Sequence, residues 1–246
     1  MQPTTIRRLL AGAALAASFP FLAAPALADD EGLDWMLVSY VWGADLTIDA
    51  RDESAGVDFS DLVNNLEVGF LGHLEVQGDD FGGFTDIVFL GVGTTENRPN
   101  FTIDVDNDTL LMDAALVWSP GEERLTGFEL FGGLRYLSND FQIVADPVAP
   151  GPPDLVGGSD SSYADALLGA RYIFPVSEHW RVTLRGDVSG GDTEGSFSVS
   201  AHAGYTTGRH TFLAGYRHLE IDLLSGSDED LTVEMSGPMI AYGFSF

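Results

Sequence analysis

Along most of this chain, large apolar residues alternate with polar or small residues at a period of two. In the last segment, every second position from Ile240 to Phe246 is apolar, and the positions between them are small. Successive side chains of a β-strand point to opposite faces, so this alternation predicts strands with one apolar face each. The segments with this pattern cover residues 34–50, 67–77, 81–93, 109–118, 128–136, 164–174, 180–188, 197–205, 210–216 and 237–246.

The connections between these segments are alternately short and long. Short turns are expected at Gly78, Ser119, Pro175 and Gly208, and longer acidic loops at 51–65, 94–100, 145–162, 190–195 and 223–230. Transmembrane barrels of bacteria have short periplasmic turns, long outer loops and an even number of strands. The sequence therefore predicts an all-β, antiparallel up-and-down transmembrane barrel of ten strands, with eight as the alternative. A soluble β-sandwich also alternates, but its outer faces are polar.

The apolar face of each strand is expected to lie against lipid and the charged face against a shared interior. On this rule the even positions of residues 36–48, including Tyr40 and Trp42, face lipid. The segment 81–93 stays open, because Asp86 lies among apolar residues on the same face.

The amino terminus has the features of a secretory signal peptide. Arg7 and Arg8 precede an apolar stretch that ends at Ala26-Leu27-Ala28. We expect residues 1–28 to be cleaved and residues 29–246 to form one barrel domain; a retained membrane anchor is the alternative. The rest of the chain has no apolar run of the ~20 residues that a spanning helix needs, so a spanning structure must be a closed barrel.

The chain is strongly acidic, with 38 Asp and Glu against 11 Lys and Arg and a formal net charge of −27. Such a charge opposes binding of nucleic acid. At a cell surface, acidic loops suit divalent cations that bridge them to anionic lipid, so outer-membrane lipid and lipopolysaccharide are the expected partners. The absence of cysteine excludes disulfides, thiolate metal sites and cysteine nucleophiles.

Several short stretches resemble a family of small proteobacterial outer-membrane β-barrel proteins of largely uncharacterised function. They are Trp42–Leu46, Phe59–Leu66, Gly72–Glu75, the repeated Gly-x-Arg-Tyr pattern and the Gly237-Pro238 pair of the last strand. The resemblance implies a barrel in the outer membrane of a Gram-negative bacterium and no established activity. The terminal Phe246 also resembles the signal through which barrel-assembly machinery recognises a carboxy-terminal strand.

Charged residues recur on the face of the strands that is expected to line the interior. One interpretation is a salt-bridged plug, because a barrel of about eight strands is only wide enough for side chains to fill. The other is a narrow polar conduit or small-ligand site. A buried charge is costly unless paired, which favours the plug. The candidate lumen residues are Glu67, Glu75, Asp86, Asp113, Glu129, Arg135, Asp165, Arg171, Arg185, Asp187 and Arg217.

Aromatic residues gather where strands meet the short turns, as expected of a girdle at the periplasmic interface. The girdle candidates are Trp118, Phe174, Trp180, Tyr205 and Phe246. Residues 59–66 have apolar positions at helical spacing, so a short helix over the barrel mouth and an extension of the second strand remain as alternatives.

Two further patterns have a chemical and a bland interpretation. Ser200 and His202 share the inward face of one strand, as a lipid-modifying hydrolase would need, but no oxyanion hole is recognisable. The acidic run 104–108 lacks the glycine and glutamate of a calcium loop. We therefore expect no metal, no cofactor and no enzymatic activity. The expected function is a structural or surface-interaction role with a filled interior, and the alternative is a narrow passive channel or small-ligand carrier.

Overall fold

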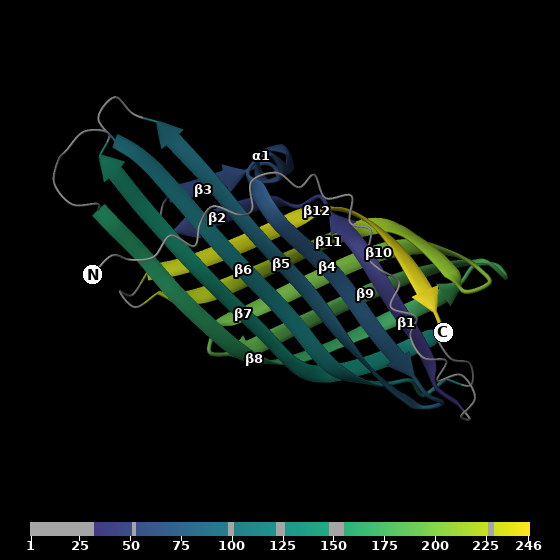
Figure 1. The fold of residues 1–246 in the computed structure, drawn as a ribbon. Coiled ribbons are helices and arrows are strands. Elements are labelled where there is room, and N and C mark those ends of the chain that lie inside the picture. The colour runs from purple at the N-terminus through teal and green to yellow at the C-terminus, as the bar shows by residue number, and fades with distance from the viewer. Residues whose placement is uncertain (1–31, 51–52, 98–100, 122–125, 148–154, 226–228) are drawn as a thin grey trace, which may run out of the picture. The chain divides into compact units, whose positions relative to one another are not determined.

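The computed structural model describes residues 32–50, 53–97, 101–121, 126–147, 155–225 and 229–246, so the predicted signal peptide lies outside the described residues. Within these ranges the chain is built of strands and one short helix (Figure 1). The elements are β1 (Asp34–Trp42), β2 (Asp45–Ala50), β3 (Glu53–Val57), α1 (Phe59–Asn64), β4 (Leu66–Gln77), β5 (Phe81–Asn97), β6 (Phe101–Trp118), β7 (Gly127–Pro147), β8 (Leu155–Pro175), β9 (Trp180–Gly191), β10 (Gly195–Thr207), β11 (His210–Ser225) and β12 (Glu229–Ser245).

The sheet formed by the strands of the described residues closes on itself. Neighbouring strands from β4 to β12 pair antiparallel in chain order, and β1 closes the ring by pairing with both β4 and β12. Both β1 and β2 pair with β12, so they are two parts of one barrel strand. The result is a closed antiparallel barrel of 10 strands, which confirms the predicted up-and-down barrel and excludes the alternative of eight.

The first barrel strand is interrupted, which corrects the prediction of one continuous strand over 34–50. The interruption at Gly43 and Ala44 lies opposite Pro238 of β12. Proline has no backbone N–H to donate to the ladder, and here its carbonyl accepts a 2.8 Å hydrogen bond from the Gly43 N–H. Beyond the break β2 turns back into β3, which adds a two-stranded extension at this edge.

The strands are much longer on one side of the barrel than on the other. β7 and β8 have 21 residues each, whereas β9 has 12. β8 pairs with β9 only as far as Asp165, while its pairing with β7 continues to Leu155 (Figure 1). The loops predicted at 94–100, 145–162 and 223–230 were therefore wrong over much of their length, because β5, β7, β8, β11 and β12 extend into them.

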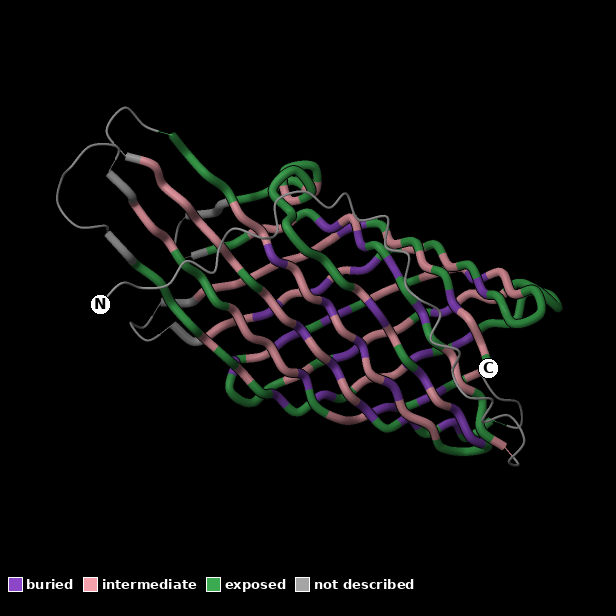
Figure 2. Tube along the Cα trace, viewed as in Figure 1, coloured by how far each residue is buried: buried purple, intermediate pink, exposed green. Residues whose placement is uncertain are grey.

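Apolar residues on the outer surface have the predicted orientation in most strands. Exposed residues alternate with more buried ones along the strands (Figure 2). Leu116, Leu168 and Ile240 are among the exposed apolar residues. The first strand is the exception, and its predicted orientation was wrong. Tyr40 and Trp42 are buried in the interior, because the lumen is not uniformly polar and provides apolar partners for them.

One apolar cluster spans the lumen from wall to wall. Leu111 of β6 and Leu219 of β11 belong to the same cluster, although these two strands lie on opposite sides of the ring. Tyr40, Trp42, Val88 and Ile221 complete its buried core together with Ala44. A second apolar cluster, of Phe84, Ala115, Val117, Phe131 and Leu167, lines the β5–β8 wall. The sequence left the orientation of the segment 81–93 undecided. In the structure, its Phe84, Asp86 and Val88 point inward.

Residues 59–64 form the helix α1, which was one of the two predicted alternatives. Its Phe59 N–H donates a 2.9 Å hydrogen bond to the Asp45 carboxylate, which ties the helix to β2. None of its residues is buried, so the helix contributes no side chain to the filling of the lumen. Within the described residues, no helix is both long and apolar enough to cross a membrane.

Candidate functional site in the barrel lumen

The register of the sheet aligns the inward charged residues into a row across neighbouring strands. His73, Asp86, Asp113, Arg135 and Asp165 lie directly opposite one another on β4, β5, β6, β7 and β8. Side chains opposite each other on one face of an antiparallel pair lie close enough to interact. Since the row alternates only partly in sign, its excess of carboxylates has to be paired with arginines from other strands.

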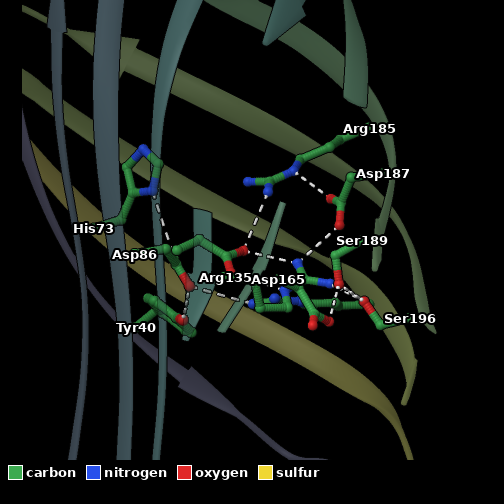
Figure 3. A network of polar contacts seen from close by, with 11 residues as sticks. Tyr40, His73, Asp86, Arg135, Asp165, Arg185, Asp187, Ser189 and Ser196 are labelled. Atoms are coloured by element: carbon green, nitrogen blue, oxygen red, sulfur yellow. Dashed lines mark hydrogen bonds and ion pairs between the residues drawn. The ribbon is translucent and has the colours of Figure 1, made fainter. Parts of the chain in front are cut away.

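Arg135 is the most highly connected arginine of the lumen (Figure 3). Its Nε and Nη2 atoms donate to the two carboxylate oxygens of Asp113, each at 2.8 Å. The same Nη2 lies 2.8 Å from Asp187 of β9, and Nη1 donates to Ser196 Oγ of β10 at 2.7 Å. Arg135 and Asp113 are only 2% and 1% exposed, so this bidentate pair is shielded from solvent.

Arg185 forms the next link of the network. Its Nε donates to Asp187 at 2.9 Å, and its Nη2 lies 3.6 Å from Asp113 (Figure 3). Its guanidinium also lies 4.8 Å and 4.7 Å from the ring centroids of Phe84 and Phe131. The second apolar cluster therefore contacts the charged network through cation–π interactions.

Arg171 joins opposite walls of the barrel. It forms ion pairs with Glu129 of the adjacent strand β7 and with Glu75 of β4, which lies four strands away around the ring. Glu129 is fully buried and also accepts a 2.8 Å hydrogen bond from Ser119 Oγ. Gln77 in turn donates to the Ser119 hydroxyl at 2.8 Å.

Asp86 is the centre of a second cross-lumen contact. It accepts a 2.9 Å hydrogen bond from the Tyr40 hydroxyl and lies 3.4 Å from Arg217 of β11, again four strands away. The imidazole of His73 lies between Asp86 and Glu75, at 3.2 Å from each carboxylate, and so connects the two cross-lumen contacts. Arg217 also packs over the Trp42 ring at 4.9 Å, which joins the network to the first apolar cluster.

Asp165 lies at one end of the network, near the β9–β10 connection. Its carboxylate accepts hydrogen bonds from Ser189 Oγ at 2.9 Å and from the backbone and hydroxyl of Thr193. Ser189 and Ser196 are 2.6 Å apart, so Asp165 is linked through two hydroxyls to Arg135 (Figure 3).

The structure thus brings together ten of the eleven candidate lumen residues. Glu67 is exposed and forms no ion pair with any residue that the structure describes. Sequence reasoning missed the uncharged members Gln77, Ser119 and Ser196. It also missed His73, whose position on the same face as Glu75 was the one available signal.

The five girdle candidates lie at the strand ends beside the short turns. Trp118, Phe174, Trp180 and Phe246 have exposed side chains, and the rings of Trp180 and Tyr205 are 5.2 Å apart. The backbone of Phe246 exchanges two hydrogen bonds with Trp35, so the last residue of the chain is part of the closing seam.

A cavity of about 130 Å³ remains beside the network. Ser200 and His202 of β10 both line it. The His202 Nδ1 atom is buried and has no hydrogen-bond partner, and within the described part of the chain no hydrogen bond joins Ser200 to His202. The arrangement therefore lacks both the nucleophile–base contact and the orienting acid of an acyl-transfer site.

The acidic run 104–108 forms part of β6, so its side chains alternate between the two faces of the sheet. The carboxylate of Asp104 accepts a 2.6 Å hydrogen bond from Thr95 Oγ1 on the neighbouring strand. Among the described residues, no group of three or more His, Cys, Asp or Glu side chains has the arrangement of a metal site.

No protein-family model matches this chain, and no curated protein matches it in sequence. Solved structures of three outer-membrane proteins are similar over most of the chain. The attachment invasion locus protein Ail of Yersinia pestis is 13% identical, with 88% of this chain and 100% of Ail covered and a TM-score of 0.37. The outer membrane protease OmpT of Escherichia coli is 8% identical, with 88% and 97% covered and a TM-score of 0.47. The toluene transporter TodX of Pseudomonas putida is 8% identical, with 88% and 90% covered and a TM-score of 0.31.

The closed sheet and the apolar outer surface of the barrel indicate where the protein is located. Only helices and closed barrels satisfy every backbone group in lipid, and this barrel is closed. Its outer surface exposes large apolar side chains on every long strand, while the charges of the lumen network are turned inward. The chain is an outer-membrane β-barrel protein of the Gram-negative type.

Proposed function

We propose that this protein is a non-conducting barrel that anchors a surface-exposed sheet in the outer membrane. The observation that carries the proposal is the filling of the lumen by contacts between opposite walls. The pairs Arg171–Glu75 and Arg217–Asp86 reach across the barrel, and the apolar cluster around Leu111 and Leu219 does the same. A ring of ten strands is far smaller than the ~16 strands of open porins, so such contacts leave no continuous aqueous path.

The proposal gives the functional role to the extended part of the β5–β8 sheet. Beyond the last pairing with β9, β7 and β8 continue as partners for many residues. On one face of this extension, Asp108, Asp140 and Asp160 lie directly opposite one another on three adjacent strands. Like charges in this arrangement destabilise a sheet. This row of carboxylates lowers the stability of the sheet, so it is better explained by a surface that contacts a partner than by a surface that only supports the fold.

A role without enzymatic activity is part of the same proposal. It is supported by the unpartnered Nδ1 atom of His202, since an acyl-transfer site needs an acid at that nitrogen.

The test is the conductance of the refolded protein in a planar bilayer. We expect no stable unitary steps from the wild-type barrel, with folding checked by its heat-dependent mobility in gel electrophoresis. Thinning the apolar layer on two walls with Trp42→Ala and Leu219→Ala should introduce brief openings. Phe212→Ala, on the lipid-facing surface of β11, is the matched control and should leave the bilayer silent. Stable steps from folded wild-type protein would overturn the proposal.

A further inference from the structure

The lumen cavity has two chemically different sides. Apolar side chains from β1, β11 and β12 form one side, including Met36, Leu213 and Met239. Polar side chains from β9 and β10 form another, including Arg181, Ser200 and His202. A space lined in this way suits a small ligand with one polar end and an apolar body.

The cations around the cavity are not equally well compensated. Arg171 and Arg217 are paired with Glu75 and Asp86, whose carboxylates also line the cavity. Arg181 differs, because it forms no hydrogen bond or ion pair with any residue in the described ranges. Arg181 is half-buried, and a cation partly removed from water without a partner is costly, so this side of the cavity is complementary to an anion.

The backbone around Arg181 allows its side chain to reach the cavity. Arg181 lies directly opposite Gly204 of β10, and Gly204 lies opposite Leu213 of β11. A Cβ atom at position 204 would lie 3.5 Å from Cγ and 3.6 Å from Nε of Arg181. The arginine stem therefore lies over the glycine, which directs it across β10 towards Leu213.

His202 provides a second polar group beside Arg181. It faces inward two residues before Gly204, which makes it a diagonal neighbour of Arg181 across the β9–β10 pair. Its buried Nδ1 atom has no partner in the protein, although a buried polar atom of this kind normally has one. An oxyanion between Arg181 and His202 would satisfy both groups.

We propose that this cavity binds a small carboxylate with a short apolar body. The carboxylate accepts hydrogen bonds from Arg181 and His202, and the apolar body packs against Met36, Leu213 and Met239. The volume of about 130 Å³ is slightly smaller than that of a ~150 Å³ cavity that binds benzene, which limits the ligand to about six non-hydrogen atoms. The site does not depend on the proposed scaffold role, since a barrel with or without conductance can contain it.

The test is a titration of the refolded full-length barrel in detergent micelles with sodium butyrate at constant ionic strength, followed by arginine side-chain NMR signals. We expect saturable shifts in wild-type protein. Arg181→Met keeps the stem and removes the charge, so it should weaken butyrate binding at least ~tenfold, as expected for a lost hydrogen bond to a charged group. Arg209→Met is the matched control, because Arg209 is exposed in the short turn before β11.

Leu213→Glu provides a test that does not depend on the Arg181 variant. It places a carboxylate opposite Gly204, where it can pair with Arg181, so the barrel should fold and no longer bind butyrate. Butan-1-ol, which has the same body without the charge, should not produce the shifts. The proposal is overturned if wild type shows no saturable shift, if butan-1-ol binds as well as butyrate, or if folded Arg181→Met or Leu213→Glu binds like wild type. Failure here leaves the conductance test unaffected, so the two proposals can be separated.

Discussion

The lumen is filled by two layers that differ in chemistry but occupy the same barrel. On β5, β6 and β11, the apolar layer, which is the cluster around Leu111 and Leu219, lies nearer the end with the long strands, and the charged layer lies nearer the short turns. On β11, for example, Leu219 follows Arg217 away from the short turn, and on β6 Leu111 lies on the corresponding side of Asp113. Both layers have members on opposite walls of the barrel.

The two layers differ in how substitutions within them affect the stability of the barrel. An apolar layer loses stability in proportion to the contacts removed, because the aliphatic side chains that form most of it require no specific partner. A buried ion network depends on completeness, since each charge left without its partner carries its own desolvation cost. The charged layer should therefore respond to single substitutions more strongly and less additively than the apolar layer.

The largest expected effect is that of Arg135→Met. The substitution leaves Asp113 and Asp187 buried without their shared guanidinium, which should lower the free energy of unfolding by about 3–5 kcal/mol. The measurement is urea unfolding of the barrel in lipid vesicles. Arg209→Met removes the same charge from an exposed turn and should change stability by no more than ~0.5 kcal/mol. Equal effects of the two variants would contradict the importance of pairing in the charged layer.

A smaller effect is expected from Leu219→Ala in the apolar layer. Leu219 is fully buried, so its truncation should cost about 2–4 kcal/mol in the same urea experiment, from lost apolar burial and from the cavity left behind. Leu168→Ala is the matched control, because Leu168 is 63% exposed on the lipid-facing surface and leaves no cavity when shortened. A cost for Leu219→Ala no greater than that of the control would show that the apolar layer is not packed across the lumen.

The alternation of residues was enough to predict the barrel, its ten strands and the inward charges. It failed for Tyr40 and Trp42, because both faces of β1 offer apolar side chains: Leu37 and Val41 point outward, and Tyr40 and Trp42 point inward. The rule that apolar faces meet lipid assumes a polar interior. This interior contains an apolar layer whose contacts come from strands far apart in the sequence.

The predicted outer loops failed for a related reason. Residues 157–162 are glycine, serine and aspartate, which have low strand propensity, yet they pair with β7 throughout. Here the pairing with the neighbouring strand determines the structure. The strand propensity of a short segment carries no information about that neighbouring strand. The ion pairs were beyond prediction for the same reason, since Arg171 and Glu75 are 96 residues apart in the chain.

The smallest expected change in the free energy of unfolding is that of a triple variant, and it distinguishes the two layers most clearly. Combining Arg135→Met with Asp113→Leu and Asp187→Leu removes the arginine together with both of its carboxylates. Replacing a complete buried ion cluster by apolar residues is often neutral or stabilising, so the triple variant should recover most of the loss seen for Arg135→Met alone, although Arg185 then needs a new partner. The measurement is the same urea unfolding, arranged as a cycle with the single and double variants. In the apolar layer, adding Ile221→Ala to Leu219→Ala should lower the free energy of unfolding further, because neither substitution removes an unpaired charge.

A triple variant that loses as much stability as the sum of its single variants would show that substitutions in both layers are additive.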